Sequence, residues 1–492
     1  MSLLTIAWRS IQQRGLASLL TTASMALGVS LVVAVLLISG IVAETFRNNA
    51  SLGYNLIVGA KGGDLQIVLN TVFHLSSPVE NLPYAFYQEF LPAAARRDRK
   101  DGQYAALVDF AIPMCMGDRF QGFRVVGTTP QLFDNYYYDI DRGRKYEFAA
   151  GRNFITRSPE YGYFEAVLGA RVADETGLKV GDAFSPTHGL KGDDSQTHDE
   201  FYVVGILAPS GTPNDRAAFV NMEGFLLLEG HSRPVVEGEA KCPLCGQILP
   251  QEDMTAHTES AGHEEALEDP SGGSLLEASR RELRALPISQ REVTAILVKT
   301  KQPIIAIPLK NELNEGVRGR AVQPIREIEN LFTSVVGPIR WTLLLITVMI
   351  CVVSGISILV SIYNSMSDRR HEIAIMRALG AGRRTVMFVV LLESIMLALG
   401  GGLIGWSCGH LLIGAAASGF IERRTGVQIG IFDLAPAIKP FELGGESPIM
   451  DWGVSTELLL VPGLILLAVL VGLLPALSAY RTDVAKSLSA NP

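Results

Sequence analysis

The sequence is poor in cysteine and in charge. Five cysteines in 492 residues are too few for a disulfide scaffold. Charged residues make up 19% of the chain and hydrophobic residues 48%, whereas soluble proteins usually carry about 25% charge. The net charge of −8 argues against nucleic acid as a partner. This composition excludes disordered and fibrous proteins and indicates a membrane protein with a large soluble part.

A phosphate-binding loop is also missing. The chain contains no G-x-x-x-x-G-K-[ST] motif and no Gly-Lys dipeptide, so it lacks the loop and the lysine that hold nucleotide phosphates. No arrangement of nucleophile and base rises above chance. We therefore predict that the protein is not an enzyme. If ATP drives it, a separate chain must hydrolyse the ATP.

Four long runs with little or no charge are each long enough to cross a bilayer, which takes about 20 apolar residues. Because backbone polar groups in lipid must be satisfied within the segment, each run predicts a helix. For the first run, a cleaved signal peptide is the alternative, although the apolar stretch is about twice the length of a typical signal core. The predicted spans are residues 16–43, 335–366 (with the end of a stalk helix), 385–420 and 458–480.

Basic residues gather on one side of the spans, and this bias sets the orientation. Arg9 and Arg14 precede the first span, and Arg481 and Lys486 follow the last one; five arginines lie between the second and third spans. Both termini should therefore be cytoplasmic. The predicted cytoplasmic segments are residues 1–15, 367–384 and 481–492, and the predicted extracytoplasmic segments are residues 44–334 and 421–457.

Residues 1–15 have the pattern of a short helix that lies in the membrane interface before the first span. The alternative is a simple helical extension of that span. The apolar residues that share one face at helical spacing are Leu3, Leu4, Ala7, Trp8 and Ile11.

The outer block, residues 44–334, has the pattern of an α+β domain. Residues 167–177 are predicted to form a helix that ends at a glycine cap, followed by a turn at 179–182. An apolar helical face from Ile325 to Val336 predicts a stalk that leads into the second span. Short β-branched or aromatic runs predict strands at 55–58, 123–126, 203–207 and 294–299.

Residues 230–289 carry a separate pattern, C-x2-C-x11-H-x5-H, formed by Cys242, Cys245, His257 and His263. Two thiolates and two imidazoles can complete a tetrahedral zinc shell, although the central spacing is one residue short of the usual zinc finger. Such a shell would let about 25 residues fold with almost no core. We therefore predict structural zinc. A disulfide or a redox pair is the alternative, because this block should face an oxidising compartment.

A second histidine-containing segment follows a different pattern. His188 and His198 flank Asp193, Asp194 and Asp199. Such a segment is typical of a solvated polar loop, and weak metal binding is the alternative.

The third predicted span contains two candidate features. Glu393 is ionisable within a span, which points to function by default; we favour a structural hydrogen bond or ion pair over proton transport. Gly401, Gly405 and Gly409 form a stripe at spacing four, which lets helices approach closely in lipid. The stripe can serve packing within the chain or between two copies.

The link between the second and third spans, residues 367–384, combines apolar anchors with charges. A short amphipathic helix at the cytoplasmic face can sit in the groove of a partner. Alternatively, its arginines only fix topology and bind lipid head groups. The candidate residues of this coupling segment are Arg369, Arg370, Glu372, Ile373, Met376, Arg377, Leu379 and Gly380.

The segment at residues 372–381 resembles the signature of FtsX-like permeases. Its sequence is Glu-Ile-Ala-Ile-Met-Arg-Ala-Leu-Gly-Ala, and Arg383 and Glu393 belong to the same resemblance. Short motifs in the outer block resemble the MacB-like periplasmic core: Gly127-Thr-Thr-Pro130, Gly151-Arg152, Val167-Leu-Gly169 and Gly181-Asp182. The resemblance covers most of the chain but not residues 230–289. It implies a permease subunit of an ABC system in the bacterial inner membrane. Such a subunit is usually dimeric and is worked by a separate cytoplasmic ATPase docked on the coupling segment.

The expected fold is four transmembrane helices with a large extracytoplasmic α+β domain between the first two and a small zinc-finger-like insert. The expected function is that of an ABC exporter or extruder permease that works by mechanotransmission, paired with a second copy or a related permease. One alternative is a signal transducer that moves no substrate and switches a periplasmic partner such as a cell-wall hydrolase. Another is a zinc-handling ABC system.

Overall fold

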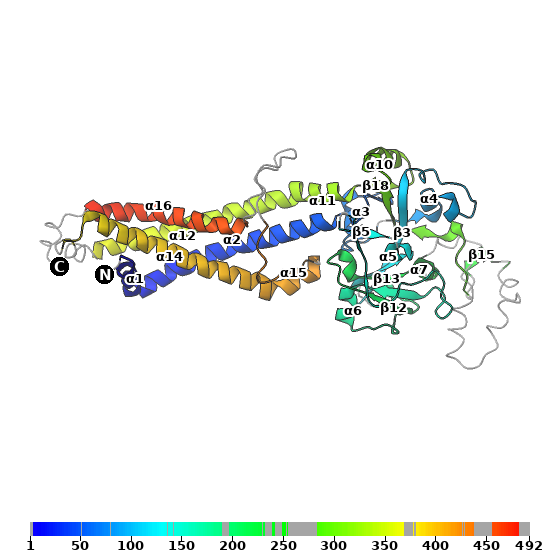
Figure 1. Ribbon diagram of the computed structural model, residues 1–492, viewed down its shortest axis with the longest axis horizontal. Helices are drawn as coiled ribbons and strands as arrows, with labels where there is room; N and C mark the ends of the chain where they lie inside the picture. Colours follow the sequence, from blue (N-terminus) through cyan, green and yellow to red (C-terminus); the bar gives the residue numbers. More distant parts are fainter. Residues whose placement is uncertain are drawn as a thin grey trace. The chain divides into compact units, whose positions relative to one another are not determined.

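The computed structural model describes residues 3–481 except 51, 79, 135, 141, 189–195, 229, 232–238, 242–247, 252, 254–282, 369–376, 378–379, 426, 428 and 437–454. It forms two compact units (Figure 1). The helical unit consists of Met1–Thr45 and Phe332–Pro492, and the sheet unit consists of Phe46–Leu331.

Within the described residues, four helices are long and apolar enough to cross a membrane. They include α2 (Gly15–Asn49), α12 (Gly337–Asp368), α14 (Arg383–Leu411) and α16 (Leu460–Arg481). The four predicted spans are confirmed as such helices. Short elements extend three of them. The π-helical turn η6 (Phe332–Val336) joins α12 to α11 (Pro324–Leu331), η7 (Leu412–Ala417) joins α14 to α15 (Ser418–Thr425), and η8 (Thr456–Leu459) precedes α16.

Small residues let these helices pack closely. The hydroxyls of Ser24 on α2 and Ser354 on α12 lie 3.0 Å apart. Gly355 on α12 faces Leu467 on α16, where an added Cβ would lie 3.2 Å from the leucine side chain. Since lipid removes the hydrophobic drive between helices, such close packing and polar contacts hold a bundle together.

Helix α1 (Leu3–Gln13) is separate from α2, with a turn at Arg14 between them. The first segment is therefore not a simple extension of the span. Ala7 and Ser10 are buried, whereas Trp8 is 52% exposed. Helix α1 packs against α14.

The sheet unit is built on one mixed sheet. Its strand order is β18-β1-β17-β3-β4-β13-β8-β12-β7, and the pairs β4–β13 and β8–β12 are parallel while the others are antiparallel. The strands are β1 (Leu56–Gly59), β3 (Val108–Phe120), β4 (Phe123–Thr128), β7 (Phe148–Gly151), β8 (Glu165–Leu168), β12 (Phe201–Leu207), β13 (Ala217–Asn221), β17 (Ala295–Thr300) and β18 (Arg320–Val322).

Shorter strands attach to this sheet or form small ones: β9 (Ala183–Phe184) pairs with β12; β10 (Thr187–His188) pairs with β3 and β11 (Gln196–Thr197); and β2 (Leu82–Pro83) pairs with β16 (Glu292–Val293), β5 (Tyr137–Asp139) with β6 (Arg144–Lys145), and β14 (Glu239–Lys241) with β15 (Ile248–Pro250). The helices are α3 (Asp64–Thr71), α4 (Tyr84–Gln88), α5 (Gln131–Asp134), α6 (Ala170–Thr176), α7 (Met222–Leu227) and α10 (Ala306–Glu315), with 3-10 turns η1 (Ala93–Ala95), η2 (Pro213–Arg216), η4 (Ile288–Gln290) and η5 (Pro303–Ile305).

The centre of the sheet is buried on both faces. Every residue of β1, β8 and β13 is buried, which explains why these strands are mostly apolar and show no alternation of apolar and polar residues. Phe164, Phe201 and Phe219 are completely buried. The large domain predicted between the first and second membrane helices is present, and it is an α/β domain where the sequence analysis expected α+β.

All four predicted strands form, as β1, β4, β12 and β17. The predicted helix at 167–177 is wrong at its start, because Val167 and Leu168 belong to strand β8 and α6 begins only at Ala170. A short apolar run fits a buried strand as well as a helix. The cap at its other end is confirmed, since Gly177 has φ 73° and closes α6.

Candidate functional site

Glu393 on α14 joins that helix to α1. Its side chain is 2% exposed and accepts a hydrogen bond of 2.9 Å from the Ser10 hydroxyl. Arg14 lies 3.5 Å away, measured from Nη1 to Oε1 of Glu393. A carboxylate within a span is costly unless it is paired and hydrogen-bonded. Ser10 supplies the hydrogen bond and Arg14 supplies the opposite charge, and both residues belong to the segment 1–15.

The glycine stripe of α14 lies against α2 of the same chain. Because the three glycines lack a Cβ, the α2 backbone and side chains approach α14 directly. An added Cβ would lie 2.7 Å from Met25 Cβ at Gly401, 2.8 Å from Val29 Cβ at Gly405 and 3.0 Å from Val33 Cβ at Gly409. The contacts on α2 recur every fourth residue, so α14 and α2 pack directly over three successive turns.

A second buried carboxylate, Glu457 in η8, was missed by the sequence analysis. It is 3% exposed and accepts hydrogen bonds from Trp406 Nε1 at 2.8 Å and from the Ala435 N–H at 2.7 Å. His410 Nε2 lies 2.7 Å from the same carboxylate, and His410 Nδ1 lies 3.0 Å from the Ile431 carbonyl oxygen. His410 thus contacts a carbonyl oxygen through one ring nitrogen and a carboxyl group through the other. The site is therefore a buried histidine–carboxyl pair.

A local signal for this pair was present. Ser455 precedes the helix that begins the last span, and its hydroxyl accepts the Glu457 N–H at 3.3 Å. A serine followed two residues later by an acid is typical of a helix start. The sequence did not indicate that the acid turns back toward His410, 47 residues earlier.

Most of the coupling segment lies outside the described residues, namely Arg369, Arg370, Glu372, Ile373, Met376 and Leu379. Arg377 is described and half-buried. Gly380 has φ 103°, which a residue with a side chain rarely adopts, and its N–H bonds to the Arg377 carbonyl oxygen at 3.1 Å. A turn thus immediately precedes α14.

The predicted zinc ligands Cys242, Cys245, His257 and His263 also lie outside the described residues. In the described part of the chain, one group of three candidate metal ligands comes together instead: Asp118, His198 and His231. Their ligand atoms all lie within 4.8 Å of one another. Of these residues the sequence analysis had considered only His198, and it had placed that residue in a different polar cluster.

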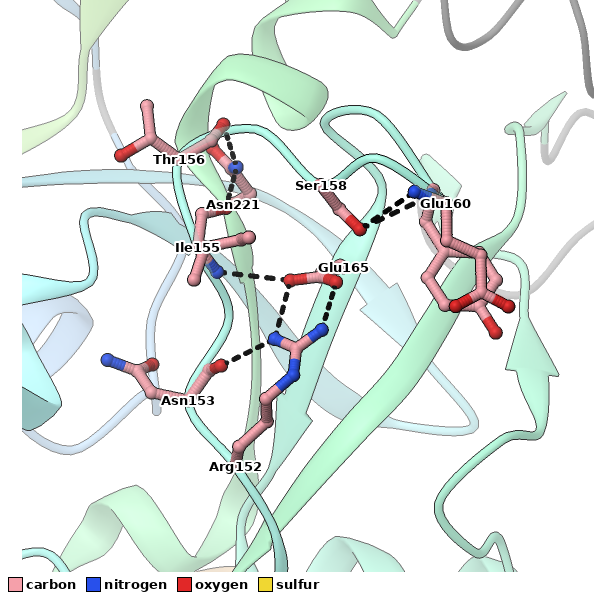
Figure 2. Close-up of polar contacts among 9 residues, drawn as sticks. Arg152, Asn153, Ile155, Thr156, Ser158, Glu160, Glu165 and Asn221 are labelled. Atoms are coloured by element: carbon pink, nitrogen blue, oxygen red, sulfur yellow. Dashed lines mark hydrogen bonds and ion pairs between the residues drawn. The ribbon is translucent and has the colours of Figure 1, made fainter.

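Arg152 of the Gly151-Arg152 motif makes polar contacts within the sheet unit, which Figure 2 shows. Arg152 makes two hydrogen bonds, of 2.6 and 3.0 Å, to the fully buried Glu165 side chain, which also accepts the Ile155 N–H at 3.0 Å. Burial raises the pKa of Glu165, but the bonds from Arg152 and Ile155 outweigh it, so the net shift is downward. The Asn221 amide donates to the carbonyl oxygens of Ile155 and Thr156 and fixes the same loop.

The comparisons with known proteins agree with this architecture. Residues 18–247 match the MacB-like periplasmic core domain, and residues 344–484 match the FtsX-like permease C-terminal domain. The two matches do not overlap and together cover about three quarters of the chain. No curated protein gives a significant match. The Arg152–Glu165 pair falls in the first match, and Glu393, the glycine stripe and Glu457 fall in the second. The chain therefore belongs to the FtsX-like and MacB-like family of ABC transporter permeases.

Proposed function

We propose that this permease transmits force from a separate cytoplasmic ATPase to its sheet unit, as the membrane subunit of an exporter or extruder. The observation that carries the proposal is the anchoring of α14. This helix follows the coupling segment directly, and it is fixed to α1 through Glu393 and to α2 through the glycine stripe.

The packing supports transmission along the bundle. With no α14 side chain between the two helices at the stripe, little of a displacement of α14 can be absorbed by rotamer changes, and α2 must move as well. Helix α2 leads into β1, and β18 leads into α11 and α12. Because β1 and β18 are paired neighbours at one edge of the central sheet, both connections deliver motion to that edge.

Coupling also needs two states that contact the partner differently. In this proposal ATP binding brings two cytoplasmic faces together, one from this chain and one from a second copy or a related permease. Residues 1–15, 367–384 and 481–492 face the cytoplasm of a bacterium, and the sheet unit lies outside the inner membrane. The partner ATPase docks on the coupling segment through Arg377 and its neighbours.

The zinc-finger-like insert remains part of the proposal. Cys242 and Cys245 lie in the connection between β14 and β15, which pair as an antiparallel hairpin. Two cysteines at C-x2-C spacing are a common half of a structural zinc shell. Thiol titration of the purified full chain under non-reducing conditions would separate two free thiolates from a disulfide.

The docking step can be tested with charge reversals. Arg377→Glu with Leu379→Glu should release the ATPase during purification from native membranes or abolish the ATP hydrolysis that the permease stimulates. Arg9→Glu on α1 is the matched control, because it reverses an exposed charge on the same predicted side of the membrane. Unchanged co-purification and unchanged stimulated hydrolysis in the double variant would overturn the docking.

Reconstitution separates the exporter from the transducer. ATP-dependent movement of a solute out of the compartment that holds the ATPase supports an exporter. ATP hydrolysis that instead switches a purified periplasmic hydrolase, without solute movement, would replace the exporter with a transducer.

A further inference from the structure

We propose that Asp118, His198 and His231 form a binding site for one divalent transition-metal ion, with zinc as the preferred ion. This site lies in the sheet unit and is distinct from the cysteine-containing pattern at residues 242–263. It would join three segments that are far apart in the sequence.

The backbone places the three side chains together. In β3, Met116 pairs with Val126 and Arg119 pairs with Arg124, so two residues of β3, including Asp118, oppose one residue of β4. Such a β-bulge redirects a side chain out of the normal alternation. His198 follows β11, and its N–H bonds to the Pro186 carbonyl oxygen. His231 follows α7, and its N–H bonds to the Leu228 carbonyl oxygen.

The distances match a tetrahedral ion. The Nε2 atoms of His198 and His231 lie 3.4 Å apart. His231 Nε2 lies 3.0 Å from one oxygen of Asp118, and His198 Nε2 lies 3.5 Å from the other. Zinc bonds of about 2.0–2.1 Å in tetrahedral geometry separate the ligand atoms by about 3.3 Å. The two imidazole nitrogens lie at about this spacing from each other, and each lies close to it from a different oxygen of Asp118.

The chemistry of the cluster also favours an ion. The side chains of Asp118, His198 and His231 are only 0%, 4% and 6% exposed. The two Nε2 atoms lie 3.4 Å apart, and each faces one oxygen of the Asp118 carboxylate. A cation held by one lone pair from each residue would bring two neutral imidazoles and a carboxylate to one centre, and a buried carboxylate is stabilised by such a charge.

The ligand set selects the class of ion. Two imidazoles with one carboxylate suit zinc and similar ions, whereas calcium and magnesium require mainly oxygen ligands. Three ligands from the described residues leave a fourth position for water or another donor.

The experiment uses the full chain in detergent, with Cys242→Ser and Cys245→Ser introduced so that the insert cannot contribute thiolates. After metal removal and dialysis against zinc, elemental analysis should find about one zinc per chain. Adding His198→Gln and His231→Gln should remove this zinc, and Asp118→Asn should weaken its binding at least tenfold. His74→Gln is the matched control, because His74 is another buried histidine of the same unit whose ring bonds to Asn214.

A measurement on the unaltered cluster covers the case in which the ligand variants fail to fold. Cobalt(II) bound to the Cys242→Ser, Cys245→Ser chain should give the intense visible bands of a tetrahedral nitrogen and oxygen site, without thiolate charge transfer. In the wild-type chain, the two histidine substitutions should lower the bound zinc by one equivalent whether or not the insert also binds zinc. Absence of bound metal in the Cys242→Ser, Cys245→Ser background would overturn the proposal, as would binding that is insensitive to all three ligand substitutions.

Discussion

The close contact between α14 and α2 at Gly405 makes a quantitative prediction. A methyl group at this position would lie 2.8 Å from Val29 Cβ and would also collide with the Ala26 carbonyl oxygen. Carbon atoms in contact normally lie about 3.5–4.0 Å apart. The helices must therefore separate locally by roughly 1 Å, and overpacking of this kind costs about 1–3 kcal/mol.

The matched control is Gly400→Ala on the same helix. No atom outside the helix backbone lies within 4 Å of an added Cβ at Gly400. This substitution should therefore be neutral or should gain up to about 1 kcal/mol from the better helix propensity of alanine. Because both variants make the same chemical change in one helix, their difference isolates the contact with α2. The propensity gain cancels in this difference, so we expect a gap of about 1–3 kcal/mol between them.

The assay is unfolding of the purified full chain in mixed micelles, followed by circular dichroism as denaturing detergent is added. Gly405→Ala should shift the midpoint to lower detergent and Gly400→Ala should not. The shift should not depend on protein concentration, since the contact lies within one chain. Equal midpoints for the two variants would show that the stripe does not support close packing here, and a strong concentration dependence would assign it to an interface between copies.

Three further predictions concern the sheet unit. Arg152→Met should lower the stability of the sheet unit by about 2 kcal/mol, because it leaves the buried Glu165 carboxylate without its charged partner. In calorimetry, adding Glu165→Gln to this variant should restore part of the lost stability. Strictly additive effects of the two substitutions would contradict the pairing. Burial lowers the pKa of His74 to about 4, so the unfolded chain binds more protons than the folded chain between pH 4 and about 6.5. The free energy of unfolding should therefore fall by up to about 3 kcal/mol as the pH drops through that window. The thermal unfolding of His74→Gln should depend less on acid, and identical pH profiles for the variant and the wild type would refute this origin. Cys115 is buried, this burial raises the pKa of its thiol, and the thiol donates a hydrogen bond to the Glu292 carbonyl oxygen. After treatment with an alkylating reagent at pH 8, mass spectrometry should find Cys115 unmodified in the native chain and alkylated in the denatured chain. Rapid alkylation of Cys115 in the native chain would contradict its burial.

Features with a local pattern were predictable. The four spans follow from runs without charge, and the Gly177 cap follows from glycine at the end of a helical pattern. The stripe at Gly401, Gly405 and Gly409 was visible as a spacing, but its partner was not. Small residues permit close approach to any helix, and only the packed bundle selects α2. At Val167 the pattern was truly ambiguous, because a short apolar run suits a buried strand and a helix equally.

Features that depend on distant parts of the chain were out of reach. Asp118 and His198 are separated by 80 residues, and Asp118 lies in a one-residue bulge of β3, which has no reliable signature in a single sequence. The pairing of Glu457 with His410 likewise requires the chain to return across the end of α14. In both cases the residue types were ordinary, and tertiary structure alone gives them a shared site.

The pairing of β1 with β18 has a consequence for how this domain can be rearranged. Ile57 lies opposite Val322 and Gly59 opposite Arg320 in an antiparallel ladder, so the point where the chain enters the sheet and the point where it leaves are on neighbouring strands at the same end. About 260 residues thus lie between two backbone positions that are neighbours in space, and the paired strands β1 and β18 join the two ends of this insertion. Domains whose ends lie side by side tolerate transplantation into other loops. A chimera that carries the sheets of another family member between Asn55 and Gln323 should therefore insert and fold, as judged by its elution as a single folded species, whereas cuts made within other strand pairs should not.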